Sequence, residues 1–172
     1  SGVPAWEATV AQPTGRSELD RLVDVDTNLI VADGAVFAAS FQGKLAVLDP
    51  NSGRPYWKRD MSTHVPMALG GGQLFVADDE SEVHAVDQRS GDTLWKQNNL
   101  RGRRLVAVRT HQGLVVTGDL EGYLHWLETT AGEPVARVRH DGDGFAGAPV
   151  VDDQVLYVLS RDGKLAAYRL KS

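Results

Sequence analysis

Short apolar runs recur along the chain, each bounded by glycine, aspartate, asparagine, glutamine or serine. The runs are rich in β-branched and aromatic side chains, which is typical of strands joined by tight turns. They occupy two successive positions of a unit, residues 35–38, 74–77, 114–117 and 155–158 in the first and residues 45–48, 83–86, 124–127 and 165–168 in the second. The pattern predicts hairpins of short antiparallel strands over most of the chain.

The residues at the turns repeat with fixed spacing. Intervals of nine, ten and four residues recur, and each unit follows the last after 38 to 41 residues. Such a period is typical of a repeat architecture, and glycine at a tight turn supplies the positive φ that hairpins need. The positions are Gly34, Gly43, Gly53 and Trp57, then Gly72, Ser81, Gly91 and Trp95, then Gly113, Gly122, Gly132 and Ala136, and in part Gln154 and Gly163.

A fourth strand follows the third turn of a unit and carries Trp57 or Trp95. Four antiparallel strands in about forty residues form the blade of a β-propeller. We therefore predict an all-β propeller with about four blades in this chain, in which each tryptophan packs against the adjacent blade. The expected divisions are 1–10 (outer strand of a preceding blade), 11–27 (inserted loop), 28–61, 62–99 and 100–140 (blades), and 141–172 (incomplete last blade).

Composition narrows the function classes. The formal net charge is −5, which argues against nucleic acid as a partner. The chain has no cysteine, so disulfides, thiol nucleophiles and cysteine-ligated zinc are excluded. The five histidines are at least 14 residues apart in sequence and fall at different blade positions, so we predict no metal site and no catalytic site.

One interval breaks the regular spacing. The outer-strand tryptophan precedes the next turn glycine by 15 or 18 residues in two units, but Trp6 precedes Gly34 by 28. The extra residues fall in 11–27, where four carboxylates face two arginines and four aliphatic side chains lie between the charges. A docking loop combines apolar contact with charge selectivity. We predict a partner-binding loop here, with an inert linker as the alternative.

Several segments resemble a known superfamily. The repeats Asp49-x-x-Ser52-Gly53-x-x-x-Trp57 and Asp87-x-x-Ser90-Gly91-x-x-x-Trp95 resemble those of the pyrroloquinoline-quinone (PQQ) propellers. Residues 12–15, 20–27 and 122–126 narrow the resemblance to the BamB family, lipoproteins of the β-barrel assembly machinery in the Gram-negative outer membrane. The resemblance covers essentially the whole chain and matches the C-terminal half of that family.

The resemblance implies a non-catalytic scaffold at the periplasmic face of the outer membrane. It implies an eight-bladed ring without a cofactor, anchored by an N-terminal lipidated cysteine that is absent from this chain. The family binds the periplasmic POTRA domains of BamA, which places Asp24 and Asp26 in the interface, with Asp20, Arg21 and Leu22 as neighbours. Whether unfolded outer-membrane protein clients are also contacted stays open.

Two other function classes are alternatives. Quinone-dependent dehydrogenases share the repeat, but they need a calcium site, a general-base aspartate and, in many members, a vicinal cysteine pair. The carboxylates of residues 78–80 fall at an expected hairpin tip, where a solvated face is the ordinary role. A generic interaction platform is the other alternative, since Arg101, Arg103 and Arg104 lie on a connection between blades and form a possible secondary patch.

The two ends of the pattern complement each other. Residues 3–10 form a surplus outer strand, and the last blade, 150–170, lacks one. An unpaired strand edge readily recruits another strand. We expect either a strand-exchanged dimer, in which two copies join head to tail, or closure of one chain into a four-bladed ring.

Overall fold

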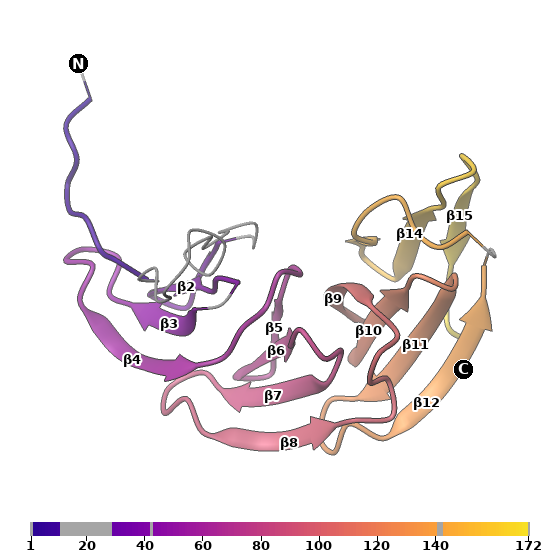
Figure 1. The fold of residues 1–172 in the computed structure, drawn as a ribbon, viewed down its shortest axis with the longest axis horizontal. Coiled ribbons are helices and arrows are strands. Elements are labelled where there is room, and N and C mark those ends of the chain that lie inside the picture. Colours follow the sequence, from indigo (N-terminus) through magenta and orange to yellow (C-terminus); the bar gives the residue numbers. More distant parts are fainter. Residues whose placement is uncertain (1, 11–28, 42, 141–142, 172) are drawn as a thin grey trace, which may run out of the picture. The chain divides into compact units, whose positions relative to one another are not determined.

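Figure 1 shows the computed structural model, which describes residues 2–10, 29–41, 43–140 and 143–171. This part of the chain is built from strands, and it contains no helix long and apolar enough to cross a membrane. The strands are β1 (Ile30–Ala32), β2 (Ala35–Ala38), β3 (Lys44–Leu48), β4 (Pro55–Asp60), β5 (Ala68–Gly70), β6 (Gln73–Ala77), β7 (Val83–Asp87), β8 (Thr93–Gln97), β9 (Leu105–His111), β10 (Leu114–Asp119), β11 (Tyr123–Glu128), β12 (Pro134–Arg139), β13 (Val150–Asp152), β14 (Val155–Leu159) and β15 (Leu165–Tyr168).

The strands form antiparallel sheets in which each strand pairs with its neighbours in sequence. Four-stranded sheets contain β1 to β4, β5 to β8 and β9 to β12, and β13 to β15 form a three-stranded sheet. Every predicted apolar run lies within the second or third strand of a sheet. The prediction of a repeating unit of four antiparallel strands is therefore confirmed.

The chain divides into two compact units. The first contains residues 1–64 and 88–91, and the second contains residues 65–87 and 92–172. Strands β1 to β4 thus belong to the first unit and β5 to β15 to the second, while the turn between β7 and β8 belongs to the first.

The turn between the third and fourth strands is built in the same way in different sheets. The amide of Gly53 donates to the carbonyl of Asp49 at 2.9 Å, and the amide of Gly132 donates to that of Glu128 at 3.0 Å. Both glycines have positive φ, +68° and +70°. Glycine adopts this conformation without steric cost, which explains its recurrence at the position.

The tryptophan of an outer strand lies against such a turn. In the second unit, the indole N–H of Trp95 on β8 donates to the carbonyl of Thr129 at 2.8 Å. A Cβ atom on Gly132 would lie 2.5 Å from the Trp95 ring, so only glycine leaves room for the indole. In the first unit, Trp57 makes the same contacts with the turn 88–91. The predicted role of the tryptophans, packing on an adjacent blade element, is confirmed.

Residues 2–10 follow the same plan without forming a strand. The indole N–H of Trp6 donates to the carbonyl of Pro50 at 2.8 Å, and its ring covers Gly53. No strand in the described part of the chain pairs with residues 2–10. The segment therefore has the side-chain contact of an outer strand but not the backbone pairing, and its exchange between two copies stays a prediction.

Two apolar clusters hold the second unit together. One joins the sheets β5–β8 and β9–β12 and includes Phe75, Trp95 and Leu127. The other joins β9–β12 to β13–β15 and includes Trp126 and Leu156. Successive side chains of a strand point to opposite faces, so β11 contributes Leu127 to one cluster and Trp126 to the other. Both faces of the sheet β9–β12 are thus covered, as expected for a propeller blade.

Candidate functional site

The residues predicted to bind a partner are Asp20, Arg21, Leu22, Asp24 and Asp26, and they lie outside the described residues. Their role stays a prediction. The described part of the chain shows how the other candidate groups are used, and these groups gather at the hairpins between the second and third strands of the sheets.

An aspartate closes this hairpin in two of the sheets. Oδ1 of Asp119 accepts the amides of Glu121 and Tyr123, both at 3.0 Å, and its Oδ2 accepts a hydrogen bond from Nε2 of His125 at 2.8 Å. The hairpin between β6 and β7 repeats this arrangement, with Asp78 in place of Asp119. The aspartate and the histidine six residues later form a structural pair.

A serine replaces the aspartate at the corresponding position of the other two sheets. Oγ of Ser160 accepts the amide of Lys164 at 3.1 Å, and the residue six positions after the serine is Ala166. Ser40 and Ala46 form the matching set in the first unit. Aspartate thus occurs with histidine and serine with alanine, because the second carboxylate oxygen needs a partner that the hydroxyl does not.

Asp119 is fully buried, and its carboxylate also bonds to an arginine. Nε of Arg103 donates to its Oδ2 at 2.5 Å, and Nη2 of the same guanidinium donates to Glu121 at 2.7 Å. Burial alone would raise the pKa of the Asp119 carboxyl, but hydrogen bonds from His125, the Tyr123 amide and Arg103 outweigh it and lower that pKa. The carboxylate in turn raises the pKa of Arg103. The result is an ionised network that ties the β8–β9 connection to the β10–β11 hairpin.

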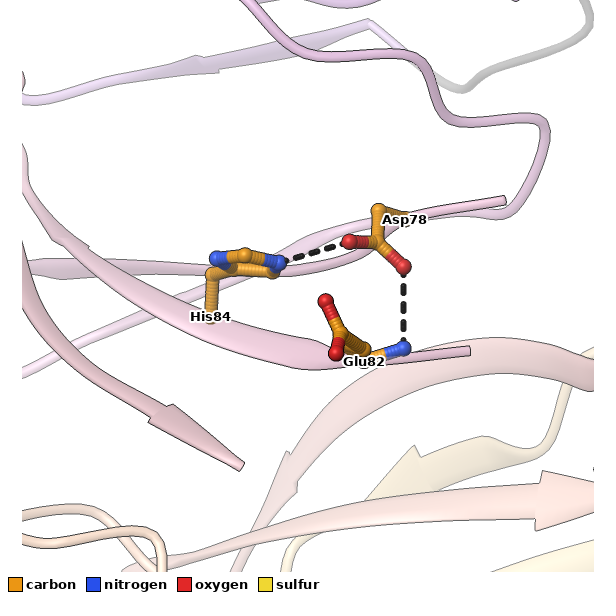
Figure 2. A group of neighbouring side chains, drawn as sticks. All are labelled: Asp78, Glu82 and His84. Atoms are coloured by element: carbon orange, nitrogen blue, oxygen red, sulfur yellow. Dashed lines mark hydrogen bonds and ion pairs between the residues drawn. The ribbon is translucent and has the colours of Figure 1, made fainter. Parts of the chain in front are cut away.

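In the described part of the chain, one group of three carboxylate and imidazole side chains is close enough together to hold a metal ion. It consists of Asp78, Glu82 and His84, whose ligand atoms lie within 4.8 Å of one another. Figure 2 shows the imidazole of His84 facing Asp78, with Glu82 beside them. Glu82 is buried and forms an ion pair with Lys96. Because each of these groups has a protein partner, we assign the group a structural role. The expectation of a solvated hairpin tip at residues 78–80 agrees with the exposed side chains of Asp79 and Glu80, but it is wrong for Asp78, whose carboxylate bonds to His84 and to backbone amides.

The predicted secondary patch is divided by its ion pairs. Arg101 forms an ion pair with Glu80, and Arg103 is held by the Asp119 network. Arg104 is exposed, with φ +55°, and its amide donates to Oγ of Ser81 at 3.0 Å. Two of the three guanidinium groups are thus neutralised within the chain, and a binding role for the patch stays a prediction.

A different group of arginines surrounds one tyrosine. The guanidinium carbons of Arg103, Arg137 and Arg139 lie 5.2, 4.8 and 5.6 Å from the centre of the Tyr123 ring. The sequence-based prediction includes only Arg103. The signal for the other two is their spacing, since residues two apart on a strand share a face.

The lowered pKa values of the hairpin aspartates Asp78 and Asp119 predict a loss of stability in acid. Burial opposes the shift at Asp78 as well, but the His84 and backbone hydrogen bonds lower its pKa below the ordinary value of 3.8. Unfolding therefore takes up protons at Asp78 and Asp119 as the pH falls, so their stabilisation is complete above 3.8 and is lost as the pH falls through the lowered values. Urea unfolding from about pH 6 to about pH 2 measures this loss. Asp78→Asn/Asp119→Asn should give a flatter acid limb, and an equally steep limb would contradict the assignment.

Known proteins resemble this chain over nearly its whole length. A family described as "Outer membrane protein assembly factor BamB" matches residues 1–97 and 79–172. Relatives with that description in Pseudomonas aeruginosa and Alkalilimnicola ehrlichii are 42% and 43% identical, over 99% and 98% of this chain. They are longer proteins, because the matches span 45% and 44% of their lengths.

The fold agrees with a solved structure of the same family. The crystal structure of BamB from Moraxella catarrhalis has a TM-score of 0.87 and 26% identity to this chain, and the match covers 94% of this chain and 48% of that one. The sheets described above, with their tryptophan contacts, therefore correspond to a portion of a β-propeller. Taken together, the family match over residues 1–172 and this fold identify the chain as a member of the BamB family of outer membrane protein assembly factors.

Proposed function

We propose that the chain is part of a non-catalytic scaffold for outer-membrane protein assembly, which binds the POTRA region of BamA through the acidic loop, residues 11–27. The observation that carries the proposal is the family match, which extends over the whole chain and includes this loop. The relatives are named as assembly factors, which supports a scaffold role over the quinone-dependent enzyme.

The acidic loop supplies the binding residues in this proposal. Asp24 and Asp26 lie at the contact, with Asp20, Arg21 and Leu22 beside them. Charged groups at an interface select the partner and speed association, while aliphatic side chains supply buried apolar area. The loop carries both kinds of side chain within a few residues.

The use of ionisable groups in the described residues supports the non-catalytic part of the proposal. The carboxylate–histidine pairs Asp78–His84 and Asp119–His125 each close a hairpin. The proposed location is the periplasmic face of the Gram-negative outer membrane, and the relatives' name, outer membrane protein assembly factor, supports it. No cofactor is part of the proposal.

Reversal of the loop charges tests the proposal. Asp24→Lys/Asp26→Lys should abolish binding to the POTRA region of BamA, measured by titration calorimetry, because interface charges that face like charges cost several kcal/mol. The circular dichroism spectrum and the melting temperature should stay close to wild type, since exposed loop charges contribute little to folding.

A matched control tests whether the loss of binding comes from the position of the loop charges or from the change in net charge. Glu128→Lys/Glu133→Lys makes the same charge change at two exposed positions of the β11–β12 turn region. This control should bind the POTRA region like the wild type. Undiminished binding by the loop variant, or equal weakening by the control, would remove the loop from the interface.

A further inference from the structure

A groove of about 370 Å³ lies in the second unit between the end of β8, the segment that follows it, and strands β11 and β12. Its apolar part contains Leu100, Leu127 and Val135, and its polar part contains Arg103, His125 and Arg137. A volume in this range accommodates one or two large side chains of a ligand. The groove therefore combines an apolar depression with a cationic end.

Strand register explains this division. Tyr123 is paired with Arg139 and His125 with Arg137, so these four side chains share one face of β11 and β12. Leu127, two residues after His125, continues the same face toward the turn. The face thus changes from cationic to apolar along the strands. Side chains that are two residues apart on this face lie about 7 Å from each other.

The cationic end has charge that the described chain does not neutralise. Arg103 is held by Asp119 and Glu121, whereas neither Arg137 nor Arg139 forms an ion pair within the described residues. Both side chains are exposed and lie near the face of Tyr123, at 4.8 and 5.6 Å from the ring centre. Contact with the ring gathers the guanidinium groups but leaves their N–H donors available, because a π face does not accept five directed hydrogen bonds.

Such a gathering is notable in a chain with a formal net charge of −5. Like charges repel, and two exposed arginines on one strand face favour an anionic partner that bridges them. Carboxylates match the planar donor geometry of guanidinium groups. The adjacent apolar depression adds the requirement that the carboxylates be accompanied by an apolar side chain.

We propose that this groove binds an extended acidic peptide segment, in which carboxylates contact Arg137 in the groove and Arg139 beside it on the same strand face, and an aromatic or aliphatic side chain enters the depression at Leu100, Leu127 and Val135. An extended chain repeats every two residues on one side, at about the spacing of the groove's cationic and apolar parts. On the side that faces the groove, every second residue of the partner thus counts, and the pattern it carries is acidic-x-acidic-x-apolar. The site is independent of the proposed acidic loop, since it has the opposite charge and lies on different residues.

Fluorescence anisotropy with short labelled peptides tests the proposal on the intact chain. The probes are a peptide with the pattern Glu-Ser-Glu-Ser-Phe, which places glutamate and phenylalanine on one side of an extended chain, the same peptide with lysine for glutamate, and a glutamate peptide of equal length in which serine replaces phenylalanine. The first should bind at least about tenfold more tightly than the other two, because it alone satisfies both parts of the groove.

Charge variants locate the binding. Arg137→Glu/Arg139→Glu should weaken the glutamate–phenylalanine peptide at least about tenfold, and Arg137→Gln/Arg139→Gln should weaken it less. Arg54→Glu/Arg161→Glu, at two exposed arginines that do not line the groove, should leave its affinity unchanged. Val135→Asp should weaken the same peptide while leaving circular dichroism unchanged, since Val135 is 51% exposed.

Three results would overturn the proposal: absence of binding by the first peptide, equal binding of the lysine or glutamate peptide, and equal loss in the Arg54/Arg161 control. Because none of these measurements involves BamA, failure here leaves the proposed acidic-loop function untouched, and failure there leaves the groove untouched.

Discussion

Replacing Trp95 with alanine is expected to lower the free energy of unfolding by about 3–5 kcal/mol, the usual cost of truncating a buried tryptophan. Trp95 is 9% exposed, lies 5.9 Å from the Phe75 ring between centroids, and donates its indole N–H to Thr129. The substitution removes apolar contact between two sheets and leaves the carbonyl of Thr129 without its donor. Urea unfolding of the two proteins measures the difference, and a loss below about 1 kcal/mol would contradict a role in joining the sheets.

Two glycines supply a matched test of the same contact. Gly132 and Gly113 have nearly equal φ, +70° and +76°, but a Cβ atom would meet the Trp95 ring only at Gly132. Alanine at Gly113 should cost about 1–2 kcal/mol for the left-handed backbone alone. Alanine at Gly132 should cost a further 1–3 kcal/mol, roughly, because the indole has to move. Equal costs would show that the ring adapts freely.

The strands and the tryptophan contacts could be predicted because their causes are local and repeated. Apolar runs of a fixed length fix the strands, and glycine four residues before Trp57 and Trp95 marks the same turn in each copy. A repeat presents the same physical problem several times, so one solution recurs. The partner of a tryptophan, however, is the turn of another sheet, as Trp95 and Gly132 show.

The two hairpin aspartates could be located from the sequence, but their structural role could not be predicted from it. Asp78 belongs to a run of three acidic residues, which usually indicates a solvated surface. Its inward direction depends on hydrogen bonds to His84 and to amides two and four residues later. Asp119 and His125 have the same six-residue spacing as Asp78 and His84. This repetition is the sequence signal that the two residues form a structural pair.

The arginines show the opposite limit of sequence reasoning. The cluster 101–104 attracts notice because its charges are consecutive, yet Arg103 reaches an aspartate 16 residues later. Arg137 and Arg139 are separated by valine and look like ordinary outward residues of an edge strand. Only the pairing of β11 with β12 brings them to Tyr123. The turn between the two strands sets the register of this pairing, and the register cannot be read from composition.

Replacing Asp119 with alanine is expected to cost about 3–5 kcal/mol of stability, because it leaves the partly buried Arg103, the buried His125 and two backbone amides without their common acceptor. Asp78 is the matched control. Its side chain is 19% exposed against 0% for Asp119, and among the described residues it bonds to His84 and two backbone amides but to no arginine. Alanine at position 78 should therefore cost less. Equal losses in urea unfolding would contradict the importance of burial and of the guanidinium.

The protein's own serine-containing hairpins provide a second version of this experiment. Asp119→Ser should keep a hydroxyl for the amide four residues later, as Ser160 does for Lys164, but it leaves His125 facing a weaker acceptor. Adding His125→Ala reproduces the natural pairing of serine with alanine. The double variant should then be more stable than the sum of the single changes predicts, by about 1–3 kcal/mol in a double-mutant cycle of urea unfolding. Strict additivity would mean that aspartate and histidine occur together in these hairpins without depending on each other. A positive coupling would mean that each hairpin accepts either complete pair and rejects a mixture.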